Sequence, residues 1–173
     1  MFQLTQRLSA LFCAFLVLLN GIFNFAMALP EDKTLPFELT SDSAQFDQAK
    51  GLGIYKGNVL LKQGTMEIRS TESRVYMVNQ ELEHIEGDGP ITMKYLPDLA
   101  KPWINGQGEK LHYDAKTGIV TLTGKAKMVQ GEDEITGDVM TYDVNKDVVR
   151  AVGSGKNQVR IEIKPNSALK DKK

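Results

Sequence analysis

Apolar and polar residues alternate along short segments over most of the chain beyond residue 37. Ile91–Tyr95 and Val159–Lys164 are the clearest cases, with an apolar residue at every second position and a threonine or charged residue between. Because successive side chains of a strand point to opposite faces, this alternation predicts strands that bury one face. No window of a dozen residues beyond position 37 has the apolar spacing of a helix, so the sequence predicts an all-β protein.

Glycine, asparagine and aspartate interrupt these segments at short and regular intervals. We interpret the interruptions as turns between many short antiparallel strands, which is typical of a sandwich, a barrel or a β-solenoid. The main turn candidates are Gly57-Asn58, Gly64, Asn79-Gln80, Gly87-Asp88-Gly89, Gly106-Gln107-Gly108, Thr117-Gly118, Gly124, Gly131, Gly137-Asp138 and Gly153-Ser154-Gly155.

The strand pattern occurs twice along the chain. Tyr55–Ile68 matches Leu122–Ile135, and a later stretch matches at an offset that is one residue shorter. Such a match predicts one supersecondary unit used twice, because each copy is too small to bury its own apolar face. Leu96–Asn105, which contains two prolines and Trp103, is predicted to be a loop between the two copies.

The first 28 residues have the composition of a cleavable export signal. Arg7 supplies a positive charge, Leu11–Leu19 an apolar core, and Ala26-Met27-Ala28 the small residues of a cleavage site. The apolar core is shorter than the about 20 residues that a membrane-spanning helix needs, although an uncleaved anchor helix is the alternative. We therefore expect residues 29–173 to work outside the cytoplasm and residues 166–173, which are polar and basic, to be a disordered tail.

Composition and motifs favour a protein without catalysis, metal or cofactor. Cys13 is the only cysteine and lies in the predicted signal, and the two histidines lack metal-ligand spacing. The formal net charge of −1 argues against a nucleic-acid binder. Asp88, Asp133 and Glu134 are the candidate catalytic carboxylates, but we interpret all three as parts of turns or of a charged hairpin tip.

The many apolar strand residues allow two interpretations. They form either a dry sandwich core or the lining of a groove between two sheets that splay apart, and composition cannot separate the two. The first and last strands contain no internal proline, so their free edges invite strand addition by another chain. The apolar residues of these predicted edge strands are Phe37, Leu39, Val159, Ile161 and Ile163.

Order and spacing of several motifs give the chain a family resemblance. It resembles the OstA-like family of periplasmic lipopolysaccharide-transport proteins, to which LptA belongs, over about residues 37–165. The departures are Lys125, where the family usually has asparagine, and Trp103 in a loop. The segments that carry the resemblance are Ser41–Asp47, Tyr55–Val59, Gln63–Thr65, Gly87–Gly89, Gly106, Leu111–Tyr113, Val120–Gly124 and Ile135–Asp138.

The resemblance implies a twisted open β-jellyroll over residues 29–165, which is a folded double sheet that holds the acyl chains of lipid A. It further implies periplasmic localisation, edge-strand pairing with LptC-like inner-membrane and LptD-like outer-membrane proteins, a head-to-tail homo-oligomer, and no cofactor. Alternation predicts which side chains line the lipid groove: Phe37, Leu39, Ile68, Val75, Met77, Met93, Leu111, Tyr113, Val120 and Leu122.

Three functions remain open from the sequence. The leading hypothesis is a carrier that passes lipopolysaccharide from the inner-membrane complex to the outer-membrane translocon. The second is a structural adaptor that tethers the two membrane complexes by its edges and binds no lipid. The third is a carbohydrate-active enzyme that uses Asp88, Asp133 or Glu134.

Overall fold

The structure is a computed structural model that describes residues 35–155 and 157–164. These residues form ten strands and no helix, which confirms the predicted all-β class. The predicted signal (1–28) and tail (166–173) lie outside the described residues. The strands are β1 (Glu38–Thr40), β2 (Ser43–Asp47), β3 (Leu52–Gln63), β4 (Met66–Val78), β5 (Glu81–Tyr95), β6 (Ile104–Asp114), β7 (Ile119–Gln130), β8 (Asp133–Asp143), β9 (Val148–Val152) and β10 (Arg160–Glu162).

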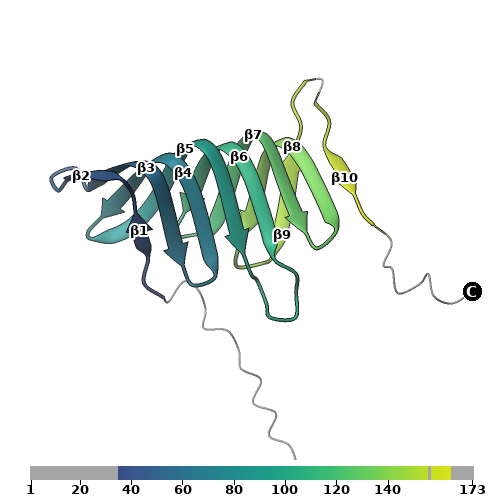
Figure 1. Cartoon of the computed structure of the whole chain (residues 1–173), viewed down its shortest axis with the longest axis horizontal. Coiled ribbons are helices and arrows are strands. Elements are labelled where there is room, and N and C mark those ends of the chain that lie inside the picture. The colour runs from purple at the N-terminus through teal and green to yellow at the C-terminus, as the bar shows by residue number, and fades with distance from the viewer. Residues whose placement is uncertain (1–34, 156, 165–173) are drawn as a thin grey trace, which may run out of the picture.

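All ten strands belong to one antiparallel sheet. Its order is β1-β3-β4-β5-β6-β7-β8-β10, with β2 paired to β3 and β9 paired to β8. The long strands β3 to β8 follow one another as hairpins along the long axis of the molecule (Figure 1). At each end of the sheet, two short strands share one long neighbour.

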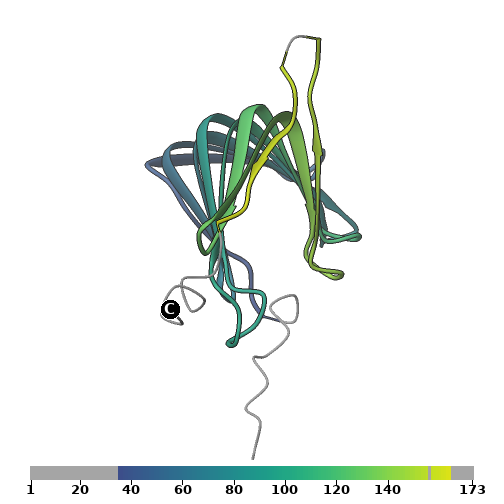
Figure 2. The same cartoon turned by 90° about the vertical axis from the view of Figure 1, so that its right-hand side faces the viewer.

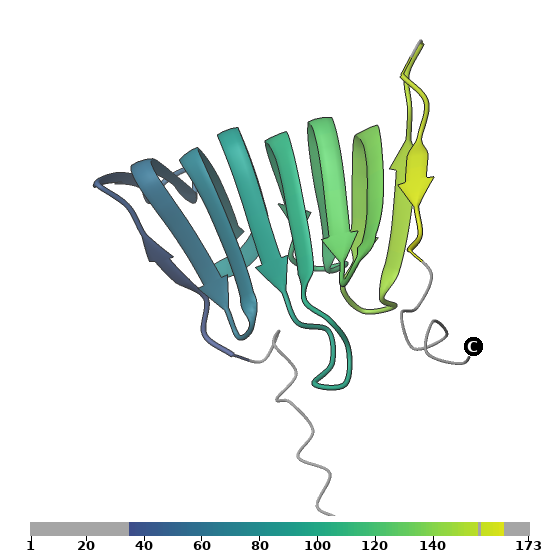
Figure 3. The same ribbon diagram turned by 45° about the vertical axis from the view of Figure 1, so that its right-hand side comes forward.

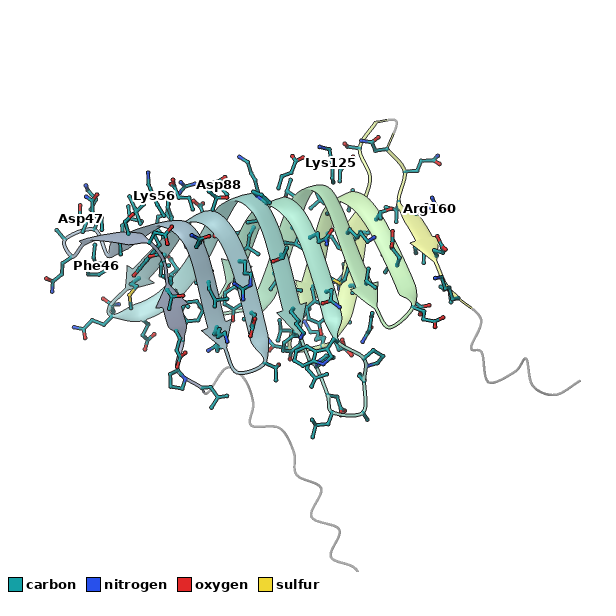
Figure 4. The ribbon with its side chains drawn as sticks, in the orientation of Figure 1. Phe46, Asp47, Lys56, Asp88, Lys125 and Arg160 are labelled. Atoms are coloured by element: carbon teal, nitrogen blue, oxygen red, sulfur yellow. The ribbon has the colours of Figure 1, made fainter. Side chains whose placement is uncertain are left out.

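A line of bulges crosses the sheet and folds it over. The strand pairing shifts register in β3 between Lys56 and Val59, in β5 between Asp88 and Ile91, and in β7 between Thr123 and Ala126. We call this line the crest; Lys56, Asp88 and Lys125 lie along it in Figure 4. Seen down the length of the sheet, the strands form an arch that is closed at the crest and open on the opposite side (Figure 2).

The crest divides the sheet into two layers. Layer 1 contains β1, β10 and residues 59–63, 66–70, 91–95, 104–108, 126–130 and 133–137. Layer 2 contains β2, β9 and residues 52–56, 72–78, 81–88, 110–114, 119–123 and 139–143. Figure 3 shows the strands of one layer in front of the other.

Glycines at the crest supply backbone conformations that other residues rarely adopt. Gly57 and Gly124 have φ values of 76° and 82°, and the residues that follow them, Asn58 and Lys125, have 47° and 48°. These positions are equivalent in the two sequence repeats, so the repeat has a structural counterpart. The prediction that both glycines are turns between strands is wrong, because each lies inside a strand of 12 residues. A bulge and a turn require the same left-handed conformation, so a glycine in the sequence does not distinguish them.

The core lies between the two layers. In layer 2 a row of paired residues runs across five strands through Val75, Ile85, Tyr113, Val120 and Tyr142. Layer 1 has the matching row: Leu61, Ile68, Met93, Gly106 and Met128. Apart from Gly106, which has no side chain, the members of both rows have buried side chains that belong to one apolar cluster. The predicted loop between the copies is confirmed over residues 96–103, and β6 begins at Ile104.

Candidate functional site

The ten predicted groove residues all contribute to the apolar cluster between the layers. Phe37, Leu39 and Met77 are partly buried and pack against it. The other seven are buried: Ile68, Val75, Met93, Leu111, Tyr113, Val120 and Leu122. The structure therefore brings the ten together on the inner face, and whether they contact a ligand stays a prediction.

Sequence reasoning missed several buried members of the same cluster. Ile85, Met140 and Tyr142 were not predicted, yet all three are fully buried. The pairing of β4 with β5 shifts register between Tyr76 and Met77, close to Ile85, and Met140 follows the crest in β8. Simple alternation therefore assigns these residues to the wrong face of the sheet. Each of them lies directly opposite a predicted groove residue on the neighbouring strand, as Ile85 lies opposite Tyr113. Strand pairing is therefore the signal that would have identified them.

Side chains of the two layers meet in the interior. The ring of Tyr95 in layer 1 lies 5.8 Å from that of Tyr142 in layer 2, measured between centroids. A β-carbon on Gly106 of layer 1 would lie 2.9 Å from Cδ1 of Leu122 of layer 2, so the leucine occupies the space that the glycine leaves. The buried hydroxyl groups of Ser70 and Ser73 bond each other at 2.7 Å. The interior is thus lined by apolar side chains of both layers, which contact each other at these places.

The apolar rows reach the surface at the C-terminal end of the sheet. A cavity of about 180 Å³ lies there between Ile135 and Ile161 of layer 1 and Val149 of layer 2. Ile161 and Ile163 are 59% and 72% exposed, although Ile161 continues the inner row of layer 1 beyond Ile135.

The N-terminal end has a similar opening on the rim of layer 2. Phe46 pairs with Gly53, which pairs with Val75, so Phe46 is the last member of the inner row of layer 2. Its side chain is 55% exposed. A cavity of about 620 Å³ lies beside it and is also lined by Met77 and Val78. In Figure 4, Phe46 lies at the end of the molecule opposite to Arg160 of β10.

The predicted edge residues belong to or flank the outermost strands. β1 pairs only with β3, and β10 only with β8, among the residues that the structure describes. Leu39 and Ile161 lie inside these strands, and Phe37, Val159 and Ile163 lie next to them. Each strand therefore presents one unpaired backbone edge.

A polar contact joins the two layers across the open side of the arch. Nζ of Lys101, in the β5–β6 loop of layer 1, lies 2.6 Å from Oδ2 of Asp147, in the β8–β9 turn of layer 2. The hydroxyl of Tyr142 donates to Oδ1 of the same carboxylate at 2.8 Å. The hydrogen bond from Lys101 holds the pKa of Asp147 below its usual range, with a smaller contribution from Tyr142. Burial, followed by the carboxylate, raises the pKa of the Tyr142 hydroxyl.

The outer face of layer 2 carries a polar cluster. Arg74 forms ion pairs with Glu72 at 2.9 Å, with Glu86 at 3.2 Å, and with Asp88. Its hydrogen bond to Glu86, with further contributions from Asp88, raises the pKa of the guanidinium. Next to this cluster His84 stacks on Tyr76, with ring centroids 4.1 Å apart.

The three candidate catalytic carboxylates lie in different surroundings. Asp88 belongs to the cluster around Arg74 at the crest of β5. Asp133 accepts a bond from the backbone N–H of Lys164, and Glu134 pairs with Lys127 at 2.6 Å, both at the start of β8. The structure does not bring them together into one site. Residues 35–155 and 157–164 contain no group of three metal-binding side chains and no helix that could cross a membrane.

Comparison with known proteins gives a consistent result. Residues 38–148 match the family described as LptA/(LptD N-terminal domain) LPS transport protein. The chain is 32% identical to lipopolysaccharide export system protein LptA of Haemophilus influenzae, over 90% of this chain and 91% of the relative. It is 31% identical to the protein of the same name from Escherichia coli K12, over 85% of this chain and 80% of the relative.

A solved structure shares the fold. The crystal structure of LptH, described as the LptA homologous periplasmic component of the lipopolysaccharide transport device of Pseudomonas aeruginosa, superposes with a TM-score of 0.73. The match covers 79% of this chain and all of the LptH chain, at 24% identity. This likeness confirms the predicted open β-jellyroll.

Proposed function

Because the chain belongs to the LptA/LptD N-terminal domain family of lipopolysaccharide-transport proteins, we propose that it carries lipopolysaccharide through the periplasm and shields the lipid A acyl chains between its layers. The observation that carries the proposal is the pair of apolar inner rows, which run the length of the sheet and reach the surface at both ends. No bond is made or broken in this role, so it needs neither a catalytic residue nor a cofactor.

The physical need for such shielding follows from the ligand. Burial of each CH₂ group stabilises by about 0.8 kcal/mol, so one chain of a dozen carbons costs roughly 10 kcal/mol to expose to water. Several chains on one lipid make diffusion through water negligible. A continuous apolar lining lets the chains slide while they stay covered.

Because side chains of the two layers already touch, the layers must separate at these places when lipid binds. Hydrogen bonds of the sheet run between neighbouring strands within each layer, so moving the layers apart leaves these ladders intact. Side-chain contacts that are lost in the interior are replaced by contacts with acyl chains, so little apolar surface is exposed overall. Met66, Met93, Met128 and Met140 are flexible and can follow the changed shape.

The free edges provide the proposed contacts with other proteins. We assign β1 and β10 to edge-strand pairing with LptC-like and LptD-like partners and with further copies of this chain. A strand added to either edge would satisfy the unpaired backbone groups and extend the sheet.

A structural adaptor is the second candidate function. The buried apolar cluster between the layers favours it, because an adaptor requires only the edges and a stable core. It predicts that the purified protein binds partner domains and takes up no lipopolysaccharide.

A photo-crosslinking experiment separates the two functions. A crosslinking amino acid at Met93 or Leu122, both buried on the inner face, should capture lipopolysaccharide during transport. Lys94 and Thr121 are the matched controls, because each is the outward-facing neighbour of one of these residues. Absence of capture from both inner positions, with normal partner binding, would favour the adaptor.

A growth test addresses the carbohydrate-active enzyme. Retained cell growth after replacing Asp88, Asp133 and Glu134 together with alanine would exclude that function.

A further inference from the structure

The open side of the arch is fastened in its C-terminal half. The β5–β6 loop, residues 96–103, belongs to layer 1, and Lys101 extends from it to Asp147 of layer 2. Tyr95 and Tyr142 meet just inside this contact, between the same two layers. In the N-terminal half, the layer 2 rim is instead hollowed by cavities of about 620 and 440 Å³, which share Val78 in their lining.

Both sides of this contact are built to hold their positions. On layer 2, Asp143 accepts bonds from the backbone N–H groups of Asn145 and Lys146, and the Asn145 amide donates to the carbonyl oxygen of Thr117 at 2.7 Å. These bonds tie the β8–β9 turn to the β6–β7 turn beside it.

On layer 1, the β5–β6 loop has internal order of its own. The backbone N–H of Lys101 donates to the carbonyl oxygen of Asp98 at 3.0 Å, and the N–H of Ala100 donates to the Asp98 side chain at 2.9 Å. At the base of the loop, Nζ of Lys94 lies 4.1 Å from the ring centre of Trp103, a cation–π contact. The loop is thus a compact arm that presents Lys101 to the opposite layer.

We propose that the contact of Lys101 with Asp147 and Tyr142 is a clasp that controls lateral access of acyl chains to the interior. This inference rests on the proposed carrier function and adds its regulation. With the clasp closed, the layers spread less readily in the C-terminal half, and lipid passes through the open side there more slowly. With the clasp open, the loop swings away and the Tyr95–Tyr142 contact can separate.

The strength of the clasp suits a device that opens repeatedly. The Lys101 and Asp147 side chains are 48% and 30% exposed, so solvent and salt screen their attraction. An ion pair of this kind shifts an equilibrium by at most about fivefold. Loss of the pair should therefore accelerate lipid uptake without unfolding the protein.

Chemical crosslinking tests whether the clasp has to open. Cys13 is the chain's only cysteine, so a Cys13→Ser background allows cysteines to be placed at Lys101 and Asp147. A short bismaleimide with a reducible linker then joins the two layers. Glu109→Cys with Lys125→Cys is the matched control, because this Lys–Glu pair, 2.8 Å apart, bridges neighbouring strands at the crest and not the open side.

The readout is the rate at which fluorescently labelled lipopolysaccharide is taken up. We expect the crosslinked clasp to slow uptake at least tenfold, reduction of the linker to restore it, and the crosslinked control to load at the wild-type rate. Lys101→Ala should load up to about fivefold faster, and the exchanged pair K101D/D147K should return toward wild type.

The outcomes separate the two proposals. Uptake by the crosslinked clasp at the wild-type rate would overturn the clasp and leave the carrier function standing. Failure of the wild-type protein itself to take up lipopolysaccharide would instead overturn the carrier function. Lys101→Ala changes an exposed side chain and keeps the test valid if the double cysteine variant fails to fold.

Discussion

Replacement of Leu122 by alanine measures how firmly the two layers interlock. Leu122 is 1% exposed, pairs with Leu111 and Met140 within layer 2, and reaches across to Gly106 of layer 1. The change removes three carbon atoms, for which transfer to water costs about 2.4 kcal/mol at about 0.8 kcal/mol each. A residual cavity adds to this cost, so we expect a loss of about 2–5 kcal/mol in the free energy of unfolding.

Thermal or urea unfolding followed by circular dichroism provides the measurement. Leu99→Ala is the matched control, since Leu99 is 63% exposed in the β5–β6 loop and its truncation should cost less than about 0.5 kcal/mol. Saturating lipopolysaccharide should reduce the difference between wild type and Leu122→Ala, because an acyl chain can occupy the vacated volume. A loss below about 1 kcal/mol without lipid would refute the reasoning, since it would mean that the layers do not interlock at Leu122.

Three further predictions concern the edge, the crest and acid stability. The backbone N–H of Lys164 points toward β8, so by alternation the backbone N–H of Ile161 points to the free edge. Ile161→Pro removes this donor and should abolish self-association on a sizing column, while the circular dichroism spectrum is retained. Lys125→Asn should raise Tm, because asparagine tolerates the φ of 48° better than lysine; an unchanged or lower Tm would contradict this. The carboxyl pKa values of Asp143 and Asp147 are lowered in the folded state, so their stabilisation is complete above the ordinary value of 3.8 and is lost as the pH falls further. Tm should therefore fall as the pH is lowered below about 4. The lowered pKa of Asp143 comes mainly from its hydrogen bond with Lys146, so Asp143→Asn should make Tm depend less on pH in this range.

Alternation predicted the inner face correctly wherever a strand runs without a bulge. Val120 and Leu122 both point inward because every second residue of a regular strand faces the same side. Prediction failed in β8, where Ile135 and Met140 both face inward although an odd number of positions separates them. The strand folds over at Asp138, which alone lies opposite Gly124 and Lys125 of β7, and this changes which positions of β8 face inward. The repeat was visible because the same glycine conformation is needed at Gly57 and Gly124.

The contact between Lys101 and Asp147 could not be predicted from the sequence for a different reason. Lys101 and Asp147 are far apart along the chain and carry no local pattern, and a lysine in a loop is usually only solvated. Their contact depends on where the folded sheet places the ends of two hairpins, which is a property of the whole arch.

The two ends of the sheet explain how a chain of such domains could keep a lipid covered. At the N-terminal end, Asp42 separates β1 from β2, and its backbone N–H donates to the carbonyl oxygen of Gly57 at the crest. At the C-terminal end, Asp138 of the crest accepts bonds from Ser154 and Asn157 in the connection between β9 and β10. Each end therefore presents two half-strands, one for each layer, on either side of a pinned crest. A partner built on the same plan would extend both layers at once, and the apolar rows would continue from one domain into the next without an interval of exposed hydrocarbon.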